Sequence, residues 1–229
     1  EAHGIRNLAL SQLYDAWETI QPGLAKRMLG LRNRDAEESL LSALYGKDSG
    51  NAKLNDAAKK VKEVMESLRV RMNSAGGDIG KLEDYGLSQS WWSARKLLRK
   101  GQNYAAQRLS DLTSRDRYVH DDGRYFSQDE KAQFMRDAWL TLVTDGASKE
   151  RPVMAGSGLK ANRHSQHRQI HFKDADSALQ AFKEFSDKSV FQVIADHVNS
   201  MSRDIALLEK FGPNADLMVK NKLEQATRE

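Results

Sequence analysis

The feature that most constrains the fold is a helical periodicity, which is longest in residues 51–73. Apolar side chains recur there at three- and four-residue spacing, at Leu54, Ala58, Val61, Met65, Leu68 and Met72. This spacing gathers the apolar side chains on one face of an α-helix. Shorter patterns of the same kind occupy residues 5–20, 35–44, 89–100, 104–112, 127–145, 174–185 and 189–211. They predict a mainly α fold, an irregular multi-helix assembly.

Extended structure is expected in only two short places. The pair Asp122-Gly123 is a strong turn signal and predicts a short strand or hairpin near residues 118–126. The alternating Ile170-His171-Phe172 predicts a short strand near residues 168–173. Ser127 followed by Glu130 has the spacing of a capping box, so a helix should begin there.

The chain divides at residue 113 into an N-terminal helical region, 1–113, and a C-terminal helical region, 114–229. The second region carries a long basic connector, residues 147–173. Loops of more than about 15 residues are uncommon inside compact domains and tend to be functional or disordered. We therefore expect the connector to be functional.

Overall composition gives little direct evidence about partners. The 36 basic and 32 acidic residues nearly cancel, to a net charge of +4, so any electrostatic case for nucleic acid must be local. The low content of large aliphatic residues indicates helices with much polar surface, either in an elongated form or packed against partners. The chain starts without methionine and stops in a charged, helix-favouring run. We therefore expect it to be part of a longer polypeptide.

Several classes of structure are excluded by what the sequence lacks. Without cysteine there is no disulfide, thiolate metal site or cysteine nucleophile. No stretch approaches the roughly 20 consecutive apolar residues that a membrane-spanning helix requires. The hydrolase signatures G-x-S-x-G and H-E-x-x-H are also missing. We predict no catalytic residue and no cofactor from motifs of this kind.

Half of the six histidines fall within eight residues of the connector. His164, His167 and His171 are interleaved with Lys160, Arg163, Arg168 and Lys173. If this run were helical, the three imidazoles would share one face and could suit zinc. Flanking glycines and the alternating pattern argue against a helix, and neighbouring cations disfavour a divalent metal. We therefore predict a polar cluster without a metal, formed by His120, His164, His167 and His171.

The same stretch is better suited to an anion. Gly156-Ser-Gly158 followed by Lys160 and Arg163 offers flexible backbone amides together with charged donors. It is not a phosphate-binding loop of the Walker type, because the terminal Gly-Lys-Ser/Thr is missing. The residues predicted to contact an anion or nucleic acid are Lys160, Arg163, Arg168 and Lys173.

Two further features allow both a structural and a functional interpretation. His120 beside Asp121 and Asp122 could act as a general base with an orienting acid, but the sequence favours a turn whose aspartates bind backbone amides. Trp91 and Trp92 open the helix predicted for residues 89–100 and would point about 100° apart. Both rings are candidates for core packing or for an interface with a partner or a base.

Four segments resemble a known group of proteins. They are Gly-Ser-Gly at 156–158, Asn-Arg at 162–163, RQIHFKDADS at 168–177 and SMSRDIALLEKFGPN at 200–214. These resemble a region of very large proteins of tailed phages and prophages, which include virion-internal, DNA-ejection and polyvalent proteins. The resemblance covers residues 115–214, about half of the chain.

The resemblance implies a setting and partners. It implies a non-enzymatic virion protein, located inside the capsid or tail and delivered to the host cell on infection. Its partners would be further copies of itself, portal or tail proteins, and DNA, with the basic loop contacting DNA or an acidic neighbour. The alternative is an enzymatic or nucleic-acid-processing module of such a protein, in which His120, Asp121, Arg163, Arg168 and His171 meet in a cleft.

Overall fold

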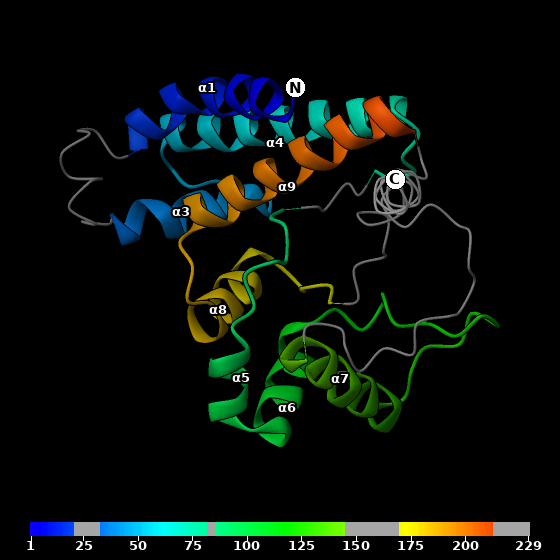
Figure 1. Cartoon of the computed structure of the whole chain (residues 1–229). Helices are drawn as coiled ribbons and strands as arrows, with labels where there is room; N and C mark the ends of the chain where they lie inside the picture. Colours follow the sequence, from blue (N-terminus) through cyan, green and yellow to red (C-terminus); the bar gives the residue numbers. More distant parts are fainter. Residues whose placement is uncertain (21–32, 82–85, 145–169, 213–229) are drawn as a thin grey trace.

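The computed structural model describes residues 1–20, 33–81, 86–144 and 170–212, and it confirms a mainly α fold (Figure 1). These residues contain eight helices and no strand. The helices are α1 (Ala2–Ile20), α3 (Arg34–Leu44), α4 (Ala52–Ser74), α5 (Ala94–Lys100), α6 (Gln102–Leu112), α7 (Gln128–Val143), α8 (Ala175–Phe185) and α9 (Val190–Phe211). Within the described ranges, none of them is long and apolar enough to cross a membrane.

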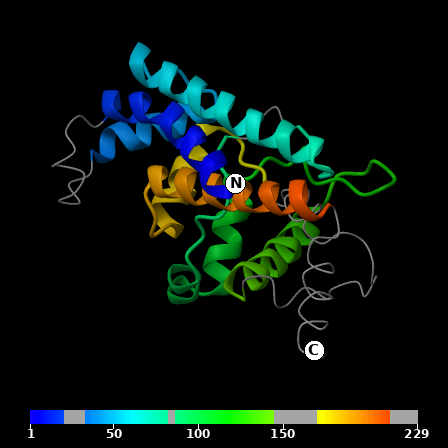
Figure 2. The ribbon, with the colours of Figure 1, turned by 45° about the horizontal axis from the view of Figure 1, so that its top comes forward.

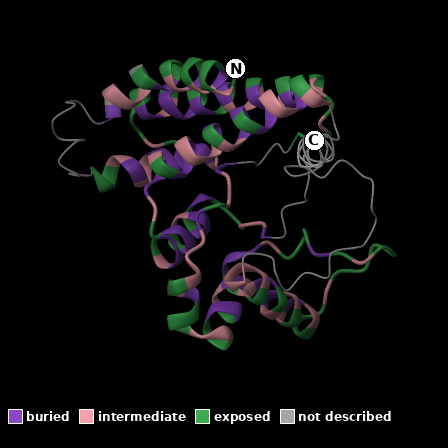
Figure 3. Ribbon diagram, in the orientation of Figure 1, coloured by how far each residue is buried: buried purple, intermediate pink, exposed green. Residues whose placement is uncertain are grey.

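The helices form an upper and a lower group, with α8 between them. The upper group comprises α1, α3, α4 and α9, which pack on one another, and the lower group comprises α5, α6 and α7 (Figures 1 and 2). Helix α8 contacts α3 above and α5 and α6 below. Buried residues line the facing sides of the upper helices, and exposed residues lie on their outer sides (Figure 3). Helices from both predicted regions, 1–113 and 114–229, therefore share the upper group.

Side-chain caps begin most of the helices, as several of the sequence signals predict. The Ser127 hydroxyl accepts from the Glu130 N–H at 3.2 Å, and the Glu130 carboxylate accepts from the Ser127 N–H at 2.7 Å, which confirms the capping box. Asp174, one of two candidates, caps α8 by accepting from the Ser177 N–H at 2.7 Å. Ser189 caps α9. The predicted buried face of α9 is also confirmed, because Val190, Ile194, Val198, Met201, Ile205 and Leu208 are all buried.

Four predicted helix starts are wrong. Helices α1 and α6 begin at Ala2 and Gln102, ahead of the predicted Ile5 and Tyr104. Helix α3 begins at Arg34 with Asn33 as its cap, ahead of the predicted start at Asp35. The helix predicted for residues 89–100 begins only at Ala94, and its cap is Ser93. The backbone of Ser93 donates to the Phe185 carbonyl at 2.8 Å, and Trp92 forms an isolated antiparallel bridge with Ser186. Pairing with this distant segment holds Trp92 and Ser93 in an extended form, so the helix cannot start before Ala94.

The two tryptophans consequently lie ahead of α5, at the joint between the helix groups. Trp91 is 1% exposed, and its ring lies 4.0 Å from Trp92 and 5.3 Å from Phe182, measured between centroids. Trp92 is half-buried and also packs near Phe172 and Phe185. Trp91 is therefore a core residue of this chain, and of the pair only Trp92 keeps some surface for a partner.

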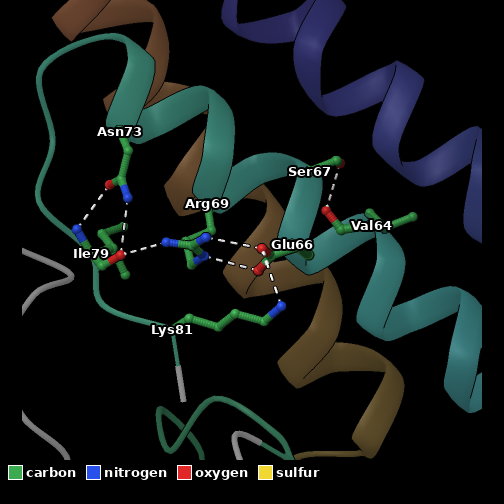
Figure 4. A network of polar contacts seen from close by, with 7 residues as sticks. All are labelled: Val64, Glu66, Ser67, Arg69, Asn73, Ile79 and Lys81. Atoms are coloured by element: carbon green, nitrogen blue, oxygen red, sulfur yellow. Dashed lines mark hydrogen bonds and ion pairs between the residues drawn. The ribbon is translucent and has the colours of Figure 1, made fainter. Parts of the chain in front are cut away.

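The loop that follows α4 is fixed by polar contacts to the end of that helix (Figure 4). The Asn73 side chain accepts from the Ile79 N–H at 2.8 Å and donates to the Ile79 carbonyl at 3.0 Å. Arg69 donates to the same carbonyl at 2.7 Å and forms a two-point ion pair with Glu66, which Lys81 also approaches. The side-chain amide of Asn73 thus makes the two hydrogen bonds to Ile79 that a backbone peptide group could otherwise make.

Candidate functional site

The residues predicted to form the site divide between described and undescribed parts of the chain. Lys160, Arg163, Arg168, His164 and His167 lie outside the described residues. His171, Lys173 and His120 are described: His171 packs against the buried ring of Tyr118, Lys173 is bonded to the end of α6, and His120 lies beside Glu130 at the start of α7. The candidate site is therefore the point where the C-terminal end of the basic connector joins the helical body.

Backbone hydrogen bonds fix that end of the connector. The Ser114 N–H donates to the His171 carbonyl at 2.9 Å, and the Lys173 N–H donates to the Leu112 carbonyl at 3.0 Å. Thr113 and Phe172 face one another as an isolated antiparallel bridge. The strand predicted near residues 168–173 is thus only a single bridge in the part that the structure describes. This bridge and the two hydrogen bonds hold His171 and Lys173 beside the C-terminal end of α6.

The predicted hairpin near residues 118–126 is present as a small, two-armed turn. The Phe126 N–H donates to the Tyr118 carbonyl at 2.9 Å, and the His120 N–H donates to the Arg124 carbonyl at 2.8 Å. Val119 and Tyr125 form the antiparallel bridge between these bonds. Figures 1 and 2 show this segment projecting from the body of the molecule, just before α7.

Tyr118 holds the hairpin and the connector end together. Its side chain is 4% exposed, and its ring packs against Phe126, Phe134 and His171 at centroid distances of 6.2, 5.3 and 6.4 Å. Its hydroxyl accepts from the His171 N–H at 3.2 Å. Burial raises the pKa of Tyr118, so the hydroxyl stays neutral at physiological pH.

Lys131 is a buried cation that sequence reasoning missed. Its ammonium group donates to the Ser110 and Thr113 carbonyls at 2.9 and 3.0 Å and lies 5.4 Å from the centroid of the Tyr118 ring. These carbonyls end α6, where cations are favoured. The available signal was the spacing of Lys131 with Met135 and Ala138, which form the buried face of α7. Phe134 and Leu142, the larger apolar side chains of the same helix, are only partly buried.

Three cations meet at this point, and we call them the cationic anchor: Arg115, Lys131 and Lys173. Burial lowers the pKa of Lys131, and the positive charges of Lys173 and Arg115 lower it further, while Asp111 opposes them. Arg115 and Lys173 are both exposed. Arg115 was also missed, because nothing in the sequence relates it to a lysine 58 positions away. The anchor presents positive charge to solvent at the base of the connector.

His120 is paired with the carboxylate of Glu130 and not with Asp121 or Asp122, its neighbours in the sequence. Its Nε2 lies 3.1 Å from a Glu130 oxygen and is shielded from solvent, although no hydrogen bond of good geometry joins the two atoms. Arg124 contacts both Glu130 oxygens at 3.3 Å. Asp122 accepts from the Arg124 N–H at 2.9 Å, which is the turn role expected of an aspartate there.

Glu130 remains ionised over the whole physiological range. The Ser127 backbone and hydroxyl, followed by Arg124, lower the pKa of Glu130 to about 2. One carboxylate thereby joins the capping box of α7 to both arms of the hairpin. We call this set of contacts the hairpin brace. In this brace the Nε2 atom of His120 is turned toward Glu130, so only the Nδ1 atom is left to exchange a proton with a substrate.

No group of three metal-binding side chains occurs within the described ranges. Two members of the predicted histidine cluster, His164 and His167, lie outside those ranges. Comparison of the chain with protein-family models, with curated protein sequences and with solved structures finds no match.

Proposed function

We propose that this chain is a non-enzymatic structural and DNA-contacting part of a phage virion protein, and that the cationic anchor and the basic connector bind DNA. The observation that carries the proposal is geometric: the Lys131 ammonium group binds the Thr113 carbonyl, and the Lys173 N–H binds the adjacent Leu112 carbonyl, two and three residues before Arg115. The connector itself contributes Lys160, Arg163 and Arg168 by sequence.

The electrostatics of the anchor favour an anionic ligand. Burial, and after it the charges of Lys173 and Arg115, lower the pKa of Lys131, while Asp111 raises it. A phosphate group bound at Lys173 and Arg115 would offset the repulsion among the three cations and form charge-assisted hydrogen bonds. A backbone bond holds Lys173 beside the end of α6, so the main chain there needs little ordering on binding.

The hairpin brace gives His120 a structural role that requires no enzymatic activity. A cleft enzyme using His120, Asp121, Arg163, Arg168 and His171 would need His120 to face a substrate. His120 instead faces Glu130, whose charge is already shared with Arg124 and the helix cap. The phage setting, the location inside the capsid or tail, and contacts with further copies, portal or tail proteins rest on the resemblance in residues 115–214 and belong to the same proposal.

The test is the salt dependence of DNA binding, measured by fluorescence anisotropy with a labelled oligonucleotide. Each phosphate neutralised adds about 0.9 for duplex, or about 0.7 for a single strand, to the slope of log K against log salt. If Arg115 and Lys173 each contact one phosphate, the double variant R115Q/K173Q should lower the duplex slope by about 1.8. The matched control, K59Q/K62Q, removes the same charge from exposed positions on α4 and should leave the slope unchanged.

Three results would refute the proposal: no binding to DNA, binding that does not vary with salt, or equal losses in the two double variants. Polyglutamate serves as a second ligand. If the chain bound polyglutamate and not DNA, the anchor would be a site for an acidic protein, and the DNA assignment would be wrong.

A further inference from the structure

We infer that the outer face of the hairpin is a contact for the bases of single-stranded nucleic acid, with the cationic anchor holding the phosphates of the same strand. The inference rests on the proposed function and adds to it the kind of nucleic acid that is bound. It concerns the side chains of Val119 and Tyr125, whose backbones form the bridge of the hairpin.

The hairpin has two chemically different faces. Side chains alternate along each arm, so Tyr118, His120 and Phe126 face α7 and pack as described above. Val119 and Tyr125 lie on the opposite face and are 46% and 52% exposed. They face each other between two hydrogen-bonded positions, where cross-strand side chains come closest. The outer face therefore carries one aromatic ring supported by a β-branched neighbour.

The position of this pair, more than its exposure, points to a ligand. Single exposed apolar side chains are common on protein surfaces and need no explanation. Here, however, the pair lies on a projecting segment whose base belongs to the cationic anchor, because the Tyr118 N–H donates to the Arg115 carbonyl at 3.1 Å. The chain from Arg115 to Tyr118 forms a turn that this bond closes, and Val119 follows directly on the first arm. The positive charge of Arg115 thus lies at the base of the hairpin, whose bridge places Val119 opposite Tyr125 on the second arm.

This arrangement fits a single strand better than a duplex. Proteins that bind single strands combine cations that follow the phosphates with aromatic rings on which bases stack. In a duplex the bases are stacked inside the helix, so Tyr125 would meet only the sugar-phosphate backbone. An unpaired strand can place a phosphate at Arg115 and Lys173 and turn a base onto the Tyr125 ring.

The hairpin brace makes the outer face rigid before any ligand arrives. Glu130 contacts His120 on one arm and Arg124 on the other, and Tyr118 packs beneath the first arm. A ring on a fixed support loses little freedom when a base stacks on it, which favours affinity. The contacts of the inner face therefore also hold the outer face in place.

The experiment compares a labelled dT12 single strand with a 12-base-pair duplex, using the full chain and three variants. Base stacking on an aromatic ring contributes about 1–3 kcal/mol, which corresponds to a loss of roughly 5- to 150-fold when the ring is removed. We expect Tyr125→Ala to weaken binding of dT12 by that factor and to leave duplex binding unchanged. Tyr125→Phe should bind dT12 like the wild type, because the ring and not the hydroxyl stacks. Tyr14→Ala removes a similarly exposed tyrosine from α1 and should have no effect.

Failure of this inference can be told apart from failure of the proposed function. If Tyr125→Ala binds dT12 normally, or if the wild type prefers the duplex, while R115Q/K173Q still weakens DNA binding, the stacking contact is wrong and the anchor stands. If neither DNA binds, both proposals fall. A thermal unfolding curve of Tyr125→Ala that matches the wild type shows that the lost affinity does not come from unfolding.

Discussion

Replacing Tyr118 tests the idea that one side chain joins the hairpin, the connector end and α7. Two substitutions separate its ring from its hydroxyl. Tyr118→Phe removes only the hydroxyl, which accepts the 3.2 Å bond from the His171 N–H and also interacts with the Thr113 side chain. Tyr118→Ala removes in addition a ring that is 4% exposed and packs against three other rings.

The two substitutions should differ clearly in magnitude. Loss of one neutral hydrogen bond lowers the free energy of unfolding by about 0.5–1.5 kcal/mol. Removing a large buried aromatic side chain lowers it by about 3–5 kcal/mol, through lost burial and the cavity left behind. For a chain of this size, each 1 kcal/mol shifts the melting temperature by about 2–4 °C. We therefore expect a small shift for Phe and a much larger one for Ala.

The measurement is urea unfolding followed by far-ultraviolet circular dichroism, with thermal melting as a second readout. Because the connector end would lose its support, Tyr118→Ala should also weaken DNA binding at the cationic anchor, whereas Tyr118→Phe should retain most of it. A loss below about 1.5 kcal/mol for the alanine variant would refute the reasoning, since a fully packed ring cannot be removed so cheaply. Equal losses for the two variants would show that the hydroxyl, and not the packing, is decisive.

Three further predictions concern other parts of the fold. Asn73→Ala removes both hydrogen bonds that fix the loop after α4 and should lower the free energy of unfolding by about 1–3 kcal/mol; no change in the urea midpoint would contradict this. The pKa of Glu130 is about 2 in the folded state, below its unfolded value, so its stabilising effect is complete above about pH 4.5 and is lost as the pH falls toward 2. The difference in urea midpoint between wild type and Glu130→Gln should therefore shrink from pH 6 to pH 3, and a constant difference would refute the role of the charge. Gly86→Ala should destabilise more than Gly46→Ala in thermal melting, because both have positive φ but only the new Cβ of the first would meet the Tyr45 ring at 2.5 Å; similar losses would mean that backbone strain alone matters.

The sequence by itself determined most of the helices and the places where several begin. Periodicity placed α4 and α9, and short-range side-chain signals placed the capping box at Ser127 and the turn at Gly123. These features depend on contacts between residues a few positions apart, which the order of residues states directly. The helix start at Ala94 was misjudged because it does not depend on such local contacts. It is set by hydrogen bonding to a segment about 90 residues away.

Only the tertiary structure decided the chemistry of the candidate site. The sequence pointed to Lys173, His171 and His120, but not to the partners that determine what these groups can do. Glu130 was visible as a capping residue and not as the partner of His120, and Lys131 looked like a surface lysine on α7. Packing of α6, α7 and the hairpin brings these groups within a few ångströms. Burial and neighbouring charge, which set the state of an ionisable group, are properties of that packing and not of local sequence.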